Sequence, residues 1–93
     1  MIIDFYSAEA EIIFMGGKSR KLPSDIQVVA LRKLRYIDSA AKLDDLRFPP
    51  GNKLEALQDN RKGQHSIRIN DQWRVCFIWE NGNAREVEIV DYH

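Results

Sequence analysis

The chain has 93 residues, and its 14 basic and 14 acidic side chains give a formal net charge of +0 at pH 7. This length predicts one domain over residues 1–93 with a small core. The neutral balance excludes a whole-protein field that attracts nucleic acid, so an anion site has to be a local patch. The single cysteine, Cys76, cannot form an internal disulfide. No apolar run is long enough for a membrane span or a signal peptide, and we expect a soluble, cytoplasmic protein.

The first part of the chain predicts a short strand over residues 1–6 and then a helix. Ser7 can cap this helix, whose first turn carries Glu9 and Glu11, where the helix dipole favours acids. Gly16-Gly17 ends it. Residues 18–21 form a basic loop, for which exposure to solvent is the simpler interpretation and contact with a phosphate backbone the alternative.

A longer helix is predicted to begin at Ser24 and to run to about residue 41. Its apolar residues recur at helical spacing and form one stripe, namely Ile26, Ala30, Leu34, Ile37 and Ala41. The pattern then indicates a helical turn over residues 43–48, a break at Pro49-Pro50-Gly51, a short strand over residues 53–57 and a polar turn over residues 59–63.

The last third of the chain predicts strands, because apolar and polar residues alternate over residues 66–70, 72–80 and 85–92. A three-residue loop over residues 81–83 would pair Phe77 with Val87 and Val75 with Ile89. A two-residue turn would instead place these apolar side chains opposite glutamates. We therefore predict the three-residue loop.

The same matching of faces places Arg68 directly across from Arg74. Opposed like charges are destabilising unless an anion lies between them, so this face is predicted to be a binding surface. The element order predicts an α+β fold in which two N-terminal helices pack on one face of an antiparallel sheet. The face that carries Arg68, Arg74 and Tyr92 is then at least partly open.

Reactive side chains end the last predicted strand, where we expect Asp91, Tyr92 and His93 beside these arginines. Metal-ligand spacing, phosphate loops and dinucleotide fingerprints are absent, so we predict neither a metal nor a cofactor. The set suits metal-free RNA cleavage, in which a base activates the ribose 2′-OH and an arginine stabilises the phosphorane. The alternative is an ordinary sheet edge, with Tyr92 packed on the sheet and His93 frayed.

Three stretches carry a resemblance to a known family. They are Gly51–Leu57, SIRINDQWRVCF over Ser66–Phe77, and VEIVDYH over Val87–His93. Together they closely resemble the HigB type of toxin, in the RelE/ParE superfamily of type II toxin–antitoxin systems. The resemblance extends over essentially the whole chain, and its specific parts are SIRINxQWR and DYH.

The resemblance implies a RelE-like microbial RNase fold and a ribosome-dependent mRNA interferase, which cuts messenger RNA in the ribosomal A site. It also implies a cognate helix-turn-helix antitoxin of the HigA-like kind. Such an antitoxin neutralises the toxin and, together with it, represses the operon, so operator DNA is contacted only through the antitoxin.

The resemblance also implies roles for individual residues. Arg74 is expected to hold the scissile phosphate, and Asp91, Tyr92 and His93 match the acid–base cluster of the family. Arg61 falls where the family often has a basic residue for RNA or ribosome contact. The remaining residues expected to contact RNA are Lys53, Glu55 and Arg68.

Two positions depart from the family pattern, because some relatives have a histidine where this chain has Glu55 and a lysine where it has Gln58. Either Glu55 acts as a base, or the chemistry rests more heavily on Arg74 and His93, or the enzyme is slow. We favour the second interpretation, with reduced toxicity as its hypothesised consequence.

Two non-catalytic functions compete with the nuclease. One is a ParE-like inhibitor that binds DNA gyrase, and the other is an RNA- or ribosome-binding inhibitor that has lost catalysis. The same fold can host all of them, so the fold does not decide. The combination of Arg74 with residues 91–93 favours the nuclease, because a protein that only binds has no need of it.

Overall fold

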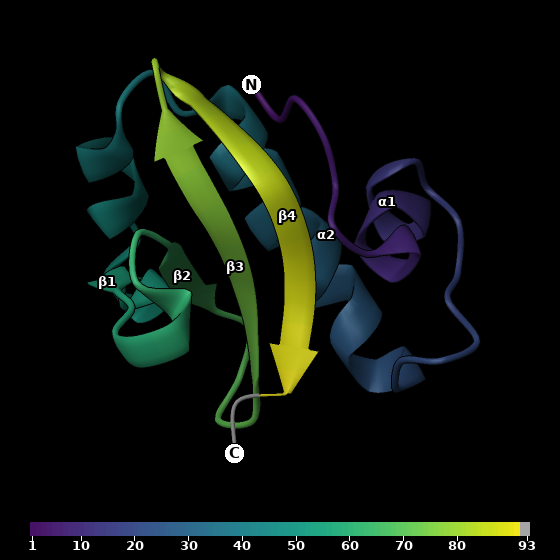
Figure 1. Cartoon of the computed structure of the whole chain (residues 1–93). Helices are drawn as coiled ribbons and strands as arrows, with labels where there is room; N and C mark the ends of the chain where they lie inside the picture. The colour runs from purple at the N-terminus through teal and green to yellow at the C-terminus, as the bar shows by residue number, and fades with distance from the viewer. Residues whose placement is uncertain (92–93) are drawn as a thin grey trace.

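The computed structural model describes residues 1–91 and confirms the predicted α+β architecture. Helix α1 spans Ala8–Phe14 and helix α2 spans Ser24–Ser39, and the short 3-10 helices are η1 (Leu43–Arg47), η2 (Pro50–Asn52) and η3 (Asp59–Arg61). The strands are β1 (Glu55–Ala56), β2 (His65–Arg68), β3 (Trp73–Glu80) and β4 (Asn83–Asp91). In Figure 1, α2 crosses behind β3 and β4 with α1 beside it, so the helices cover one face of the sheet.

Both helices begin where the sequence predicts them. Ser7 caps α1, because its Oγ accepts a hydrogen bond from the backbone N–H of Ala10 at 3.3 Å. The apolar stripe of α2 is buried as predicted, except at its last residue. Ala41 is exposed and Ala40 is buried instead. The prediction for Ala41 is wrong because α2 ends at Ser39, and the extended backbone of Ala40 breaks the helical spacing.

The sheet consists of four antiparallel strands in the order β1-β2-β3-β4. The predicted pairing of Arg68 with Arg74 is confirmed, as is the pairing of Val75 with Ile89. Val75, Ile89 and Phe77 belong to the core that packs against the helices. Successive side chains of a strand point to opposite faces, so Arg74 lies on the face away from the helices.

The hairpin between β3 and β4 differs from the prediction. Glu80 pairs with Asn83, so the turn contains only Asn81-Gly82, both at positive φ (54° and 78°), which is typical of a type I′ turn. The register shifts between the pairs Ile78–Arg85 and Cys76–Glu88. The three-residue loop is therefore wrong, because the extra residue lies inside the strand.

This extra residue forms a β-bulge in β4. Glu86 has a φ of 51° and its backbone N–H donates to the Oδ1 atom of Asp4 at 2.6 Å. Phe77, predicted to pair with Val87, lies opposite this bulge. Two residues of β4 thus oppose one of β3, and beyond the bulge the apolar faces match again.

Residues 1–6 form less of a strand than expected. They make two isolated parallel bridges with β4, Ile2 with Ala84 and Phe5 with Val87. The backbone N–H of Ile3 donates to the carbonyl of Ala84 at 2.8 Å. This segment therefore covers the outer edge of β4 and occupies backbone groups that would otherwise be exposed.

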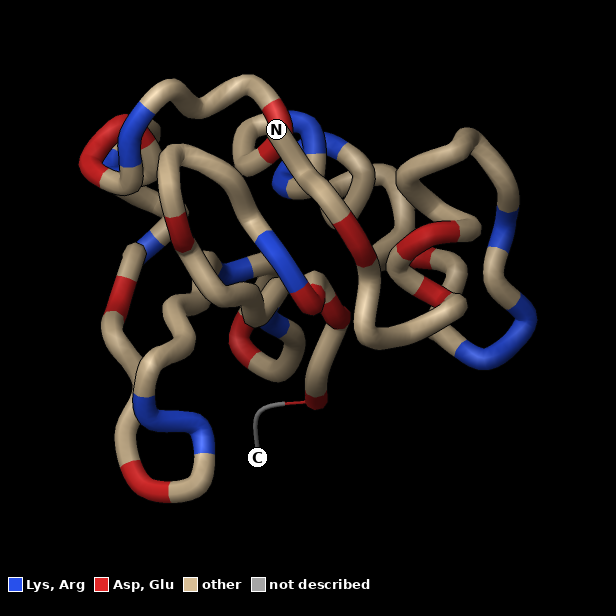
Figure 2. Tube along the Cα trace, turned by 45° about the horizontal axis from the view of Figure 1, so that its top comes forward, with Lys and Arg blue, Asp and Glu red and all other residues tan. Residues whose placement is uncertain are grey.

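Charge is spread along the chain. Basic and acidic segments are interspersed along the tube of Figure 2, and the loop over residues 18–21 is basic. None of the helices within residues 1–91 has both the length and the apolar character that crossing a membrane requires.

Candidate active site

Arg74 lies on the sheet face away from the helices and is only 9% exposed. Its Nε atom donates to the Oγ atom of Ser66 in β2 at 2.8 Å, and its Nη2 atom donates to the backbone carbonyl of Lys53 at 2.5 Å. Acceptors on two different segments fix the plane of the guanidinium group. A planar guanidinium suits the oxygens of a phosphate, so β3 presents an oriented cation.

Lys53 and Glu55 approach Arg74 from the segment that precedes β2. Lys53 ends η2 in a left-handed conformation with a φ of 45°, and its backbone carbonyl accepts the hydrogen bond from Arg74. Glu55 in β1 pairs with Ser66, and its Oε1 atom lies 3.7 Å from the Nε atom of Arg74. Two of the residues expected to contact RNA are thus joined to Arg74, one by its backbone and one by its side chain.

A second arginine–glutamate pair lies beside the first. Arg61 donates to the Oε1 atom of Glu88 at 2.7 Å and to the Oε1 atom of Gln64 at 3.0 Å. Glu88 pairs with Cys76 of β3, the strand that carries Arg74. Burial raises the pKa of the Cys76 thiol to about 11. The neighbouring arginines lower this pKa and the neighbouring glutamates raise it, each by less than burial does. This thiol therefore stays protonated near neutral pH and does not act as a nucleophile.

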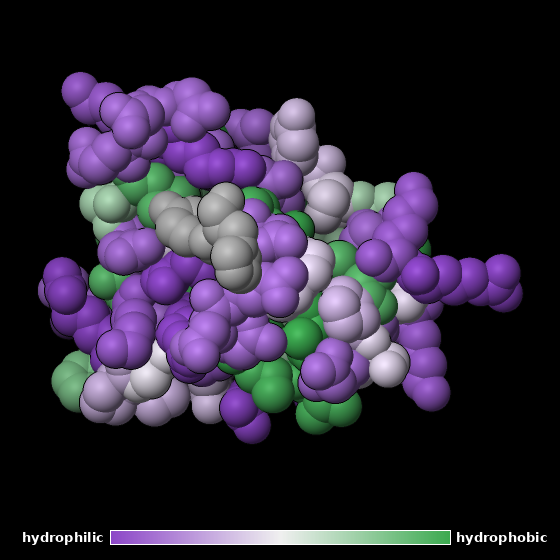
Figure 3. Space-filling model, turned by 90° about the horizontal axis from the view of Figure 1, so that it is seen from below, coloured by the Kyte–Doolittle hydropathy of each residue, from purple (hydrophilic) through white to green (hydrophobic). Residues whose placement is uncertain are grey.

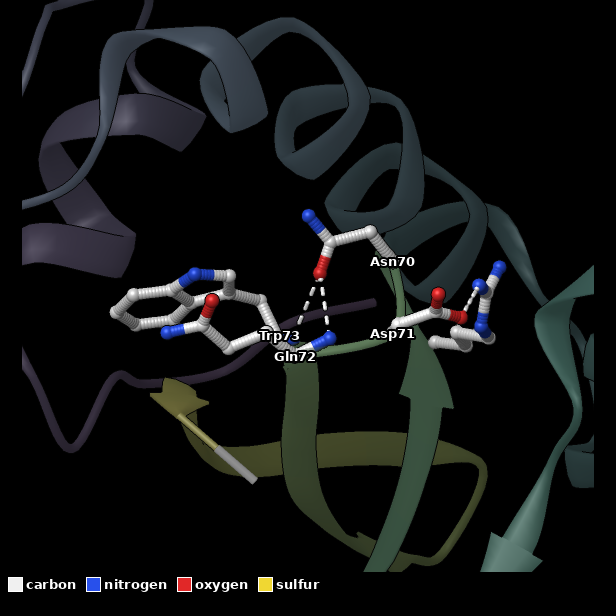
Figure 4. Close-up of polar contacts among 5 residues, drawn as sticks. Asn70, Asp71, Gln72 and Trp73 are labelled. Carbon is white, nitrogen blue, oxygen red and sulfur yellow. Dashed lines mark hydrogen bonds and ion pairs between the residues drawn. The ribbon is translucent and has the colours of Figure 1, made fainter. Parts of the chain in front are cut away.

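Arg68 lies directly across from Arg74, yet the two side chains turn to different carboxylates. Arg68 pairs with Asp71 in the turn between β2 and β3, as drawn in Figure 4, whereas Arg74 lies beside Glu55. The expected repulsion between the arginines is therefore offset by carboxylates of the chain itself. As a consequence, this face is less open and less positive than the sequence alone indicates.

Asp91 is held at the same turn. The Oδ1 atom of Asn70 accepts hydrogen bonds from the backbone N–H groups of Gln72 and Trp73, each at 2.8 Å (Figure 4). The Nε2 atom of Gln72 then donates to the Oδ2 atom of Asp91 at 3.0 Å. Asp91 pairs with Trp73, so strand alternation directs its side chain to the face opposite that of Arg74.

The other residues of the expected acid–base cluster, Tyr92 and His93, lie outside the described residues. The second histidine, His65, stacks on Phe77 with ring centroids 6.4 Å apart. Burial lowers the pKa of His65, so its ring is neutral at physiological pH and packs with the core. Within residues 1–91, no three His, Cys, Asp or Glu side chains are grouped so that they could hold a metal ion.

Sequence reasoning missed Ser66 and Glu88, although strand alternation carried a signal for both. Ser66 lies two residues before Arg68, and Glu88 lies two residues before Val90, which pairs with Arg74. Period-two spacing places each of them on the face of Arg74. The hydrogen bond to Ser66 and the ion pair to Glu88 depend on three-dimensional distances that this spacing does not give.

Two of the cavities in the described structure have no lining residue in common. One of about 250 Å³ adjoins the Arg61–Glu88 pair and is also lined by Tyr6, Asn60, Gln64 and Glu86. A larger one of about 350 Å³ lies between α1 and α2, and none of the residues described above as part of the site lines it. Figure 3 shows hydrophilic side chains around the end of β4 and apolar surface towards the helices.

Comparison with known proteins identifies relatives over nearly the whole chain. A model of the family described as RelE-like toxin of type II toxin–antitoxin system HigB matches residues 4–93. Toxin HigB-1 of Vibrio cholerae serotype O1 is 41% identical over 85 residues, which cover 90% of this chain and 90% of that protein. Endoribonuclease HigB of Proteus vulgaris is 29% identical over 93 residues and covers 100% of both chains.

A solved structure shares the fold. The crystal structure of a heterotetrameric YoeB-YefM toxin–antitoxin complex from Staphylococcus aureus contains a chain that matches with a TM-score of 0.61 and 16% identity. The match covers 100% of this chain and 98% of that one. This likeness confirms the RelE-like fold expected from the sequence.

Proposed function

Because the chain belongs to the HigB family of RelE-like toxins from type II toxin–antitoxin systems, we propose that it is an endoribonuclease that cleaves messenger RNA on translating ribosomes. The curated relative called Endoribonuclease HigB supports cleavage of RNA. Dependence on the ribosome and action in the cytoplasm, where translation takes place, are parts of this proposal.

The observation that carries the proposal is the orientation of Arg74. Its guanidinium group is nearly buried and held by Ser66 and by the carbonyl of Lys53, while Glu55 lies at 3.7 Å. A preorganised cation in a site with little water stabilises developing negative charge more strongly than a mobile surface cation. We therefore assign to Arg74 the role of binding the scissile phosphate and stabilising the negative charge that increases in the pentavalent phosphorane.

The nucleophile of the proposed reaction comes from the RNA itself. A base removes the proton of the ribose 2′-OH, the 2′-oxygen forms a bond to the adjacent phosphorus, and the bond from phosphorus to the 5′-oxygen breaks. The leaving 5′-oxygen takes up a proton, and the products are a 2′,3′-cyclic phosphate and a 5′-hydroxyl. These proton transfers are assigned to Tyr92 and His93, with Glu55 as a further candidate base beside Arg74. Asp91, whose side chain lies on the opposite face, is assigned to holding the end of β4 through its hydrogen bond from Gln72.

The cations around Arg74 are proposed to contact the RNA on either side of the cleaved bond. Arg68 in β2 pairs directly with Arg74, and Arg61 ends η3 and contacts Glu88 of β4. Lys53, which follows η2, is exposed. Each of the arginines is paired with a carboxylate of the chain. RNA phosphates have to compete with these carboxylates, which favours a substrate that is already held in place by the ribosome.

The proposed partner in the resting cell is a cognate antitoxin. Membership of a type II toxin–antitoxin family implies such a partner, and the YoeB-YefM complex shows one for a protein of the same fold. We assign to this chain a helix-turn-helix, HigA-like antitoxin that blocks cleavage. Operator DNA is then contacted through the antitoxin, because the formal net charge of +0 gives this chain no overall attraction for DNA.

The proposal predicts new messenger RNA ends shortly after the chain is induced in cells without its antitoxin. The induced chain is compared with Arg74→Ala, with a version that lacks His93, and with Arg85→Ala as a matched control, because Arg85 pairs with Glu80 at the far end of the sheet. We expect cuts within translated frames for the unchanged chain and the control, and a loss of roughly 100-fold or more in Arg74→Ala.

Two results would overturn this proposal. Cuts that persist at full rate in Arg74→Ala would remove the arginine from the mechanism. Intact messages together with growth arrest and DNA damage would point to inhibition of DNA gyrase. Cuts at the same positions in messages that are not translated would remove the ribosome from the proposal while leaving the nuclease in place.

A further inference from the structure

Asn52 joins the helix layer to the loop that reaches the active site. Its side chain is fully buried, and its Nδ2 atom donates to the carbonyl groups of Leu46 and Phe48, each at 3.1 Å. Its Oδ1 atom accepts a hydrogen bond from the Nζ atom of Lys33 at 2.6 Å. One amide group therefore ties α2, η1 and η2 together.

Lys33 is an unusual residue for the inner surface of a helix. It is only 6% exposed, and within residues 1–91 no carboxylate lies within ion-pair distance of it. Burial lowers its pKa, and the nearby charges of Arg32 and Arg68 lower it further. A buried ammonium group without a carboxylate partner is unfavourable for stability. Its Nζ atom lies 5.6 Å from the centroid of the Tyr36 ring on the same helix, and the hydrogen bond to Asn52 links it to η2.

The residue after Asn52 supplies the acceptor for Arg74. The backbone N–H of Lys53 donates to the carbonyl of Pro50 at 3.1 Å, which closes η2, and the left-handed conformation of Lys53 then turns its carbonyl towards β3. That carbonyl accepts the 2.5 Å hydrogen bond from the Nη2 atom of Arg74. Anchoring Asn52 therefore also fixes the oxygen that orients the guanidinium group.

We propose that Lys33 and Asn52 are positioning residues of the nuclease, which hold the Lys53 carbonyl where it orients Arg74 towards the scissile phosphate. This inference rests on the proposed function of Arg74. Neither residue contacts the reacting atoms, and both act through the backbone of η2. A displacement of a catalytic group by about 1 Å can lower the rate by roughly 100-fold, so a small movement of this loop has a large effect.

The first test replaces Lys33 by methionine, which keeps an unbranched side chain and removes the donor to Asn52. Cleavage is measured on purified ribosomes that translate a defined message. We expect kcat to fall by about 10- to 100-fold with little change in KM, and the urea midpoint to stay close to that of the unchanged chain. Ile26→Val is the control, because it removes a buried methylene from the other end of α2 and should leave kcat unchanged.

A double-mutant cycle separates positioning from a general structural role. Arg74→Lys removes the guanidinium fork that reaches the Lys53 carbonyl, so Lys33→Met should add almost nothing to the loss already caused by Arg74→Lys. In ¹⁵N–¹H spectra, the Nη2–H signals of Arg74, which report on the bond to the Lys53 carbonyl, should exchange faster with solvent in Lys33→Met than in Ile26→Val. Asn52→Asp, which loses both donors to the loop carbonyls, should reproduce the fall in kcat and covers the case in which Lys33→Met does not fold.

The outcomes distinguish this inference from the function on which it rests. If Arg74→Lys abolishes cleavage while Lys33→Met and Asn52→Asp keep full kcat and a slowly exchanging Arg74 signal, the positioning role is wrong and the nuclease stands. If Lys33→Met lowers the rate equally in both backgrounds, the lysine acts independently of Arg74 and the inference fails. If Arg74→Lys and Arg74→Ala both cleave normally, the proposed function itself is wrong.

Discussion

At the scale of single residues, Glu55 is the side chain that most directly opposes the binding of RNA. Its carboxylate is about half exposed and lies 3.7 Å from the Nε atom of Arg74. A phosphate that approaches Arg74 meets this negative charge first. The carboxylate also neutralises part of the repulsion between Arg74 and Arg68, so it contributes to the fold while it weakens the attraction for an anion.

Neutralising Glu55 should therefore tighten RNA binding. In Glu55→Gln we expect the affinity for ribosomes programmed with a non-cleavable 2′-O-methyl message to rise by roughly fivefold, since an exposed charge pair contributes up to about 1 kcal/mol. Glu80→Gln is the matched control, because Glu80 is similarly exposed and lies 3.4 Å from Arg85. Equal affinities for the two variants and the unchanged chain would show that Glu55 does not compete with RNA.

The sequence predicts which residues of the site share a face of the sheet. It does not predict which hydrogen-bond partners orient them. Arg74, Arg68 and Glu88 follow from the period of two, because alternation depends only on the local backbone. The partners of Arg74 do not follow from it: Lys53 contributes a backbone oxygen, which every residue type has. Asn52 is missed because the sequence does not show that its amide is buried, whereas the other asparagines are half-buried or exposed.

At the scale of the elements, the bulge in β4 aligns the apolar faces of β3 and β4, for which the sequence pattern favours a three-residue loop. The tight Asn81-Gly82 turn sets one register near the hairpin end, and the extra residue at Glu86 shifts it so that Val75 again meets Ile89. Face matching therefore predicted correctly that one residue had to be added. It could not say where, because a turn and a bulge correct the register equally well.

The bulge makes Glu86 sensitive to the shape of its side chain. At a φ of 51°, a β-branched residue is strained, and glycine is not. We expect Glu86→Val to lower the free energy of unfolding by roughly 1–2 kcal/mol, as measured by urea denaturation. Glu86→Gly serves as the control and should equal or exceed the stability of the unchanged chain. A valine variant as stable as the glycine variant would mean that the bulge lies at another residue.

The helices were predicted more reliably than the connections between them. Ser7 and the glycines after Phe14 are strong local signals for the start and the end of α1. The end of α2 carries no such signal, since Ser39, Ala40 and Ala41 all tolerate a helix, and the boundary was missed by two residues. The connection from η1 to η2 depends on the burial of Leu46 and Asn52, which is a property of the tertiary structure.

At the scale of the whole molecule, residues 1–6 and strand β4 hold the two ends of the described chain together. The backbone N–H of Ile3 donates to the carbonyl of Ala84, whose residue is fully buried, and the N–H of Tyr6 donates to the carbonyl of Val87. These bonds satisfy an edge of the sheet that would otherwise be available to another chain.

Removing one of these donors should destabilise the entire fold. We expect Ile3→Pro to lower the free energy of unfolding by roughly 1–3 kcal/mol more than Ile3→Ala, because the carbonyl of Ala84 then loses its partner. Both variants remove the half-exposed side chain of Ile3, so their difference isolates the backbone bond. Equal urea midpoints for the two variants would show that the segment contributes little.

The contact between residues 1–6 and β4 also sets the moment during synthesis at which the protein can fold. β4 is the last of the described elements to be made, and it contributes Glu88 and the pairing partners of Arg74 and Val75. While β4 is still inside the exit tunnel of the ribosome, the first residues have no edge to pair with and the face around Arg74 is incomplete. The proposed nuclease therefore lacks its complete Arg74 face until β4 has been made, and it becomes competent to act on a message only after β4 has emerged.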